Sequence, residues 1–200
     1  MADMMMNRGK FKWTIIDRFK QLLFPDVIMS YLKSMRYTEF LSSSMAHGNK
    51  GPIELISYVY HQYRLKRLDR MLGFSIGYNT LGYGVVIPHS GTIVIGSSNR
   101  IGPYAVLHTS TCITDNGKRI GKALYLATGA ILTSNLNLGD NVSIGANSLV
   151  NKSFGSDLLI AGSPAKEIKK SNAWYIRDGE NFIKRVNEVE NLKSKLELNI

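Results

Sequence analysis

Histidine is the side chain best suited to move a proton near neutral pH, and this chain has four. Two of them, His89 and His108, lie 19 positions apart in a stretch with few charges, where a purely structural histidine is harder to justify. His47 and His61 lie among residues with a helical pattern, which favours a structural role for both. His89 and His108 are therefore the candidates for acid–base chemistry.

Other reactive groups are few. The single cysteine, Cys112, has no partner for an internal disulfide and excludes a cysteine metal cluster, so we expect no metal and a reducing compartment. No apolar run approaches the roughly 18–20 residues of a transmembrane helix, and the first residues lack the pattern of a secretory signal. These observations predict a cytoplasmic protein.

The charge of the chain is unevenly distributed. A composition of 44% hydrophobic and 20% charged residues predicts a folded domain, and the formal net charge is +10. Residues 1–72 hold 12 basic and 6 acidic side chains, residues 73–165 hold 5 and 3, and residues 166–200 hold 8 and 6. Because the excess lies mainly in the first segment, we expect no nucleic-acid partner. The basic N-terminal helices form either a solvated surface or a peripheral contact with a membrane.

These three segments also differ in periodicity. In residues 1–72, apolar residues recur at three-to-four spacing before Pro25, again from Val27, and again from Ile53, which predicts helices. Residues 166–200 contain the same spacing between Phe182 and Leu196, which predicts one amphipathic helix.

The middle segment, residues 73–165, carries a six-residue repeat. An aliphatic residue returns at every sixth position, with one step of seven between Ile113 and Ile120. The repeated residues are Ile95, Ile101, Leu107, Ile113, Ile120, Leu126, Leu132, Leu138, Ile144 and Val150. This period fits a parallel β-helix in which three hexapeptides close one coil and the aliphatic side chain points inward. The open ends of such a prism need caps, and the two flanking segments are suited to this role.

The repeat segment resembles the hexapeptide-repeat acyltransferases, in particular the serine acetyltransferases and related polysaccharide-biosynthesis acetyltransferases. The pattern I-G-x-G, then His, then G-x-V-I-G falls on residues 81–84, His89 and residues 91–96. The sequences IGANSLV (144–150) and AGSPAK (161–166) are similar to the final coils of that family. The resemblance implies a mainly β fold, namely a left-handed parallel β-helix with an α-helical N-terminal segment and a C-terminal helix, assembled as a homotrimer.

The resemblance also implies acetyl transfer from acetyl-CoA to a hydroxyl group, with His89 as general base. A histidine one coil later, His108, is a candidate for the acceptor site, as are Lys118 and Arg119, which could bind a carboxylate. Coenzyme A is expected in the groove between neighbouring subunits. The residues expected to contact it are Ala127, Gly129, Ala130, Gly145, Ala146, Ser148, Lys166, Lys169 and Lys170. The glycines have an alternative role as corners of the coil, and the lysines as a solvated tail.

Two departures from the serine acetyltransferases bear on the acceptor. The acidic residue that orients the histidine in that family has no counterpart in residues 74–76, and the D-R-H-P motif has none in residues 114–119. We therefore expect a sugar hydroxyl in surface polysaccharide biosynthesis as the acceptor, with L-serine as the alternative. A non-catalytic scaffold built on the same repeat is the alternative from another class.

Overall fold

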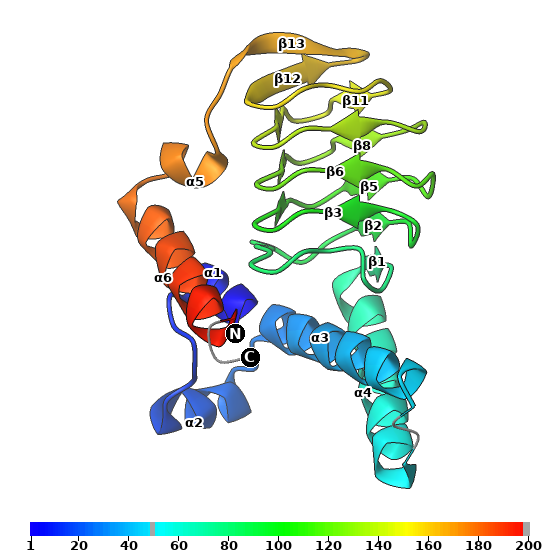
Figure 1. Cartoon of the computed structure of the whole chain (residues 1–200), viewed down its shortest axis with the longest axis vertical. Helices are drawn as coiled ribbons and strands as arrows, with labels where there is room; N and C mark the ends of the chain where they lie inside the picture. Colours follow the sequence, from blue (N-terminus) through cyan, green and yellow to red (C-terminus); the bar gives the residue numbers. More distant parts are fainter. Residues whose placement is uncertain (49–50, 198–200) are drawn as a thin grey trace.

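The computed structural model describes residues 1–48 and 51–197, and its central feature is a prism of parallel strands (Figure 1). Three helices, α2 (Ile15–Leu23), α3 (Val27–Ala46) and α4 (Pro52–Leu72), occupy the regions where the spacing predicts helices. A further helix, α1 (Ala2–Arg8), precedes them, and α5 (Trp174–Arg177) and α6 (Glu180–Glu197) follow the prism. No helix in the described part of the chain is long and apolar enough to cross a membrane.

The prism has three faces, each a sheet of short strands stacked one coil above the next. Sheet A contains β1 (Phe74–Ile76), β2 (Ile93–Ile95), β5 (Thr111–Ile113), β8 (Ile131–Leu132) and β11 (Leu149–Val150). Sheet B contains β3 (Arg100–Ile101), β6 (Arg119–Ile120) and β9 (Asn137–Leu138). Sheet C contains β4 (Val106–Leu107), β7 (Tyr125–Leu126), β10 (Ser143–Ile144), β12 (Leu158–Gly162) and β13 (Ala165–Lys170).

The predicted six-residue repeat forms the core of this prism. All ten repeated aliphatic residues are buried, and the strands that carry them pair in parallel register, for example Ile95 with Ile113. The seven-residue step is a loop in which Gly117 adopts a φ of 70° and the backbone leaves the coil by one residue. The β-helix fold predicted from the sequence is confirmed.

The three faces have different outer surfaces. Sheet B presents Arg100, Arg119 and Asn137, all exposed. Sheet C is covered in its first coils by the C-terminal segment, where the Trp174 indole donates to the carbonyl oxygen of Tyr104 at 2.7 Å. Sheet A presents a column of partly exposed apolar residues, in which Cys112 pairs with both Val94 and Ile131.

The N-terminal helices cap the first coil by hydrogen-bonding its open backbone edge. From α1, the Asp3 carboxylate accepts from the Val85 N–H at 3.0 Å, and the Asn7 amide donates to the Val85 carbonyl at 2.8 Å. From α3, the Arg36 guanidinium donates to the carbonyl oxygens of Leu81 at 2.8 Å and Gly82 at 2.6 Å. The strand edge that would attract another strand is thus satisfied by side chains.

The last coil is capped differently from expectation. Residues 166–200 were expected to be helical, but the chain first turns back as β13, which pairs antiparallel with β12. The free edge of sheet C explains this, because its unpaired backbone groups outweigh the weak local helical preference of the segment. The predicted amphipathic helix begins only at Glu180, where α6 runs back beside the prism toward α1 (Figure 1).

The cap on the first coil makes a prediction about stability. Asp3 is 7% exposed and also pairs with the Arg36 guanidinium at 2.8 Å. An Asp3→Ala variant leaves a buried N–H and part of a guanidinium without a partner. We therefore expect the free energy of unfolding to fall by about 2–4 kcal/mol. Urea unfolding measures this difference. The exposed Glu188→Ala variant on α6 is the control, and equal midpoints for the two variants would show that the cap contributes nothing.

Candidate active site

Both candidate histidines lie along one corner of the prism, where the chain passes from sheet C to sheet A. His108 directly follows β4, and the strand pairing Leu107 with Leu126 and Leu126 with Ile144 stacks the following residues above it. We call this corner the histidine edge, and it comprises residues 88–91, 108–110, 127–130 and 145–148. Stacking therefore brings together segments that lie about 18 residues apart in the sequence.

His89 is the more accessible of the two histidines. It follows Ile87 and Pro88 at the first coil and is exposed. Within the described part of the chain its imidazole makes no hydrogen bond, so both ring nitrogens are open to a ligand. An exposed imidazole of this kind can accept a proton from an approaching hydroxyl group.

His108 is half-buried and held by the coil above it. Its Nε2 lies 2.9 Å from the Tyr125 hydroxyl, and the two ring centroids are 5.2 Å apart. Burial lowers the pKa of His108, and a charge on His89 lowers that pKa further, while Asp178 raises it. His89 thus lies close enough to His108 to oppose its protonation. The lowered pKa favours the neutral form of His108.

The C-terminal segment adds a cation beside Tyr125 and a carboxylate that influences His108. The Arg177 guanidinium lies over the Tyr125 ring, 4.4 Å from its centroid, and its Nε donates to Asp178 at 2.6 Å. Sequence reasoning missed both residues. They lie at the end of α5, and their approach depends on the chain folding back from β13, for which the local sequence carries no signal.

Lys118 and Arg119, expected at the acceptor site, do not join this edge within one chain. Lys118 is buried in the loop between sheets A and B, where its Nζ donates to the Thr114 carbonyl at 2.7 Å and hydroxyl at 2.9 Å. Burial lowers the pKa of Lys118. Arg119 points outward from sheet B. Lys118 thus stabilises the loop at which the repeat lengthens from six residues to seven.

The small residues expected to contact coenzyme A lie on the histidine edge, but not all are accessible. Ala146 is exposed and Ala127, Gly129 and Gly145 are partly exposed, whereas Ala130 is buried. Gly129 also has a conformational reason for its identity, because its φ is 75° and an added Cβ would collide with the Asn147 side chain.

Ser148 is less accessible than expected, whereas the three lysines are exposed. Ser148 is buried, and its hydroxyl accepts from the Gly162 N–H at 3.1 Å, so it stabilises the last corner and is not available to a pantetheine arm. Lys166, Lys169 and Lys170 lie exposed on β13, beyond the final coil. Their position leaves them free to meet phosphate groups.

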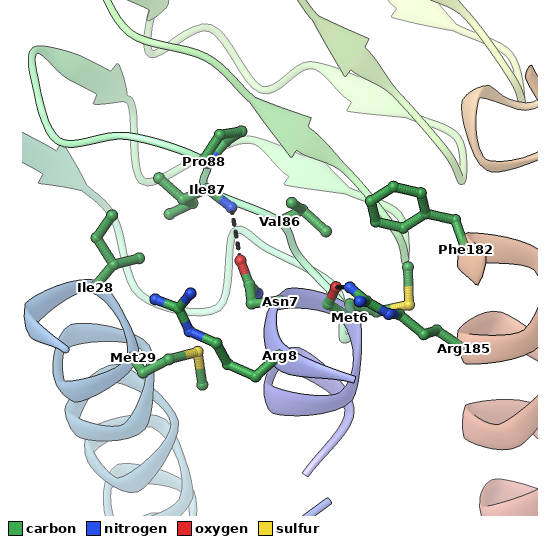
Figure 2. Close-up of a pocket in the computed structure, with 10 residues that line it drawn as sticks. All are labelled: Met6, Asn7, Arg8, Ile28, Met29, Val86, Ile87, Pro88, Phe182 and Arg185. Carbon is green, nitrogen blue, oxygen red and sulfur yellow. Dashed lines mark hydrogen bonds between the residues drawn. The ribbon is translucent and has the colours of Figure 1, made fainter. Parts of the chain in front are cut away.

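A pocket of about 240 Å³ adjoins the histidine edge below the first coil (Figure 2). Its roof is the segment from Val86 to Pro88, which leads directly into His89, and its sides come from α1, the start of α3 and α6. Two guanidinium groups border it. Arg8 pairs with Asp26, and Arg185 donates to the Met6 carbonyl at 2.7 Å.

The arrangement supports proton transfer more directly than metal chemistry. An exposed imidazole stands beside a neutral one, and residues 1–48 and 51–197 contain no group of three His, Cys, Asp or Glu side chains able to hold a metal ion. The site can bind a hydroxyl group, accept its proton and pass that proton to a leaving group.

Part of the chain is similar in sequence to a serine acetyltransferase. No family model matches the chain. The serine acetyltransferase of Synechococcus elongatus is 32% identical over 98 residues, which are 46% of this chain and 40% of that protein. The chain thus aligns with about two fifths of the curated relative.

The solved structures share the fold at low identity. The serine O-acetyltransferase of Brucella melitensis has a TM-score of 0.64 and 18% identity, covering 86% of this chain and 68% of that chain. The soybean enzyme in its apo form has a TM-score of 0.62 and 16% identity, covering 84% and 66%. The resemblance to hexapeptide-repeat acetyltransferases of the serine acetyltransferase type, and their left-handed β-helix fold, are confirmed.

The electrostatic coupling at the histidine edge predicts how His108 titrates. Its pKa lies below the ordinary 6.5. A His89→Gln variant, which removes the imidazole that opposes protonation of His108, should raise the pKa of His108, and an Asp178→Asn variant should lower it further. NMR titration of the imidazole protons measures both shifts. An unchanged pKa in both variants would show that the three groups do not form one cluster.

Proposed function

We propose that this chain is an acetyl-CoA-dependent O-acetyltransferase that acetylates L-serine, with His89 as general base. The observation that carries this proposal is the exposed imidazole of His89 on the same corner as the small-residue segments 127–130 and 145–148. Serine acetyltransferases with this fold include one structure in complex with CoA and one, from Neisseria gonorrhoeae, in complex with serine.

The comparisons, more than the residues, support L-serine as the acceptor. The sequence-based expectation of a sugar acceptor in polysaccharide biosynthesis finds no support, because the curated relative and the solved structures reported above are serine acetyltransferases. The missing D-R-H-P motif means that a serine carboxylate needs a different cation in this chain. We propose Arg177, whose guanidinium lies over the Tyr125 ring, for that role.

The proposed reaction uses few side chains. The His89 imidazole removes the proton of the acceptor hydroxyl as its oxygen attacks the thioester carbonyl. The carbon–oxygen bond forms, the carbon–sulfur bond breaks, and the proton on the imidazole passes to the departing thiolate of coenzyme A. Neutral His108, hydrogen-bonded to Tyr125, adds no like charge that would oppose protonation of His89.

A homotrimer and a cytoplasmic location belong to the same proposal. Of the three faces, sheet B is polar and sheet C is covered by the C-terminal segment, whereas the column of Val94, Cys112 and Ile131 on sheet A is apolar and partly exposed. A neighbouring subunit on sheet A would border the histidine edge and form a groove for coenzyme A. The unpaired Cys112 in that column is compatible with a reducing compartment.

Acetyl transfer can be tested with a thiol-release assay on acetyl-CoA and candidate acceptors. We expect L-serine to stimulate release of coenzyme A more than sugars do, and a His89→Ala variant to lose 10²–10⁴-fold in rate because it lacks the base, an order-of-magnitude expectation. The matched control is His47→Ala, since His47 is exposed at the end of α3 and hydrogen-bonds Ser43.

Each possible outcome of the thiol-release assay tests one of the alternatives to this proposal. Unchanged turnover in His89→Ala would remove the catalytic assignment, and no release with any acceptor would favour a non-catalytic scaffold. Release with a sugar but not with serine would restore the sugar acceptor.

A further inference from the structure

The helix α2 exposes its entire apolar face to solvent. None of the residues of α2 is buried, and all of its large apolar side chains, with the Phe24 that follows them, are 59–86% exposed. They are Ile15, Ile16, Phe19, Leu22, Leu23 and Phe24. In Figure 1, α2 lies at the helical end of the molecule, apart from the prism. A cluster of this size on one surface helix indicates a binding surface.

Helix α2 is stabilised by hydrogen bonds at its N-terminus rather than by burial of its side chains. The Thr14 hydroxyl accepts from the Asp17 N–H at 3.1 Å, and the Asp17 carboxylate accepts from the Thr14 N–H at 2.9 Å. Lys10 lies 2.7 Å from the same carboxylate, and these contacts lower the pKa of Asp17 to about 2. The apolar face is therefore presented in a defined conformation, although none of the residues that the structure describes covers it.

The charges of α2 are arranged around that face. At 100° per residue the apolar side chains span about 120° of the helix, with Leu22 at one edge and Ile16 at the other. Arg18 lies about 40° beyond the Leu22 edge and Lys20 about 40° beyond the Ile16 edge, while Asp17 and Gln21 occupy the opposite side. Neither Arg18 nor Lys20 makes an ion pair among the residues that the structure describes.

We propose that α2 binds the surface of a membrane containing anionic lipids, with its apolar face in the interface and Arg18 and Lys20 on the headgroups. An apolar face with a basic residue along each edge is the arrangement that in-plane helices use, because long basic side chains reach the lipid phosphates while their stems cover apolar surface. A second copy of α2 fits less well. Face-to-face pairing would bring the basic edges of two copies together in a protein of net charge +10.

This proposal is independent of the proposed acetyl transfer, because α2 contributes no residue to the histidine edge. It also differs from the expectation that the basic helices as a group contact a membrane. On α4, the basic residues Arg64, Lys66 and Arg67 follow an apolar stretch instead of bordering it. The surface defined by α2 is the one with the geometry of an interfacial helix.

Vesicle flotation of the full chain tests the proposal. We expect binding to phosphatidylcholine vesicles that contain phosphatidylglycerol and much weaker binding to phosphatidylcholine alone. An Arg18→Gln/Lys20→Gln variant should bind the anionic vesicles about thirtyfold more weakly, because each basic residue near such a surface contributes about fivefold in affinity. A Phe19→Ser/Leu22→Ser variant should lose binding to both kinds of vesicle.

The matched control is an Ile53→Ser/Ile56→Ser variant on α4, which removes apolar side chains of similar exposure, and it should bind as the unmodified protein does. Light scattering on each variant reports the assembly state, and circular dichroism reports the fold. Unchanged vesicle binding in the Phe19→Ser/Leu22→Ser variant would overturn the proposal. A smaller assembly in that same variant would assign the face to a contact between subunits instead.

Discussion

The whole structure depends on one constraint, which is that every coil must place an aliphatic side chain at the same point inside the prism. Ile95, Ile113, Leu132 and Val150 form one such column, and each is at most 2% exposed. Because the backbone of one coil hydrogen-bonds the next, residues about 18 positions apart are stacked on the same corner. The position of His89 relative to His108 and to Ala127 is thus a consequence of core packing rather than of local sequence around each residue.

Stacked coils leave two open ends, and the chain satisfies them by different means. Asp3, Asn7 and Arg36 hydrogen-bond the first coil, whereas β13 pairs with the last strand of sheet C. The first cap and the pocket in Figure 2 are built from the same elements, since α1 carries Asn7 toward the strand that leads to Pro88. The elements that complete the fold at this end therefore also shape the surroundings of His89.

The sequence predicts the repeat, the helices and the corner that carries the histidines, because each depends on a periodic pattern or on a fixed step between coils. It does not predict the contacts that depend on how distant segments meet. From the sequence, Lys118 is a candidate to bind the acceptor. In the structure its ammonium group is buried and hydrogen-bonds the Thr114 carbonyl within a loop. Asp178 comes close to His108, and Arg177 to Tyr125, only because β13 redirects the chain. The apolar stripe of α2 looks like core, although no element among the described residues covers it.

In the proposed function the acetyl donor and the proton acceptor lie on one corner of the prism, and amide hydrogen exchange with and without coenzyme A tests that placement most directly. Residues 108–110, 127–130 and 145–148 should exchange more slowly with the ligand present, while the corner formed by residues 102–105, 121–124 and 139–142 should be unaffected. Slower exchange on that second corner alone, with no change along the histidine edge, would contradict the account.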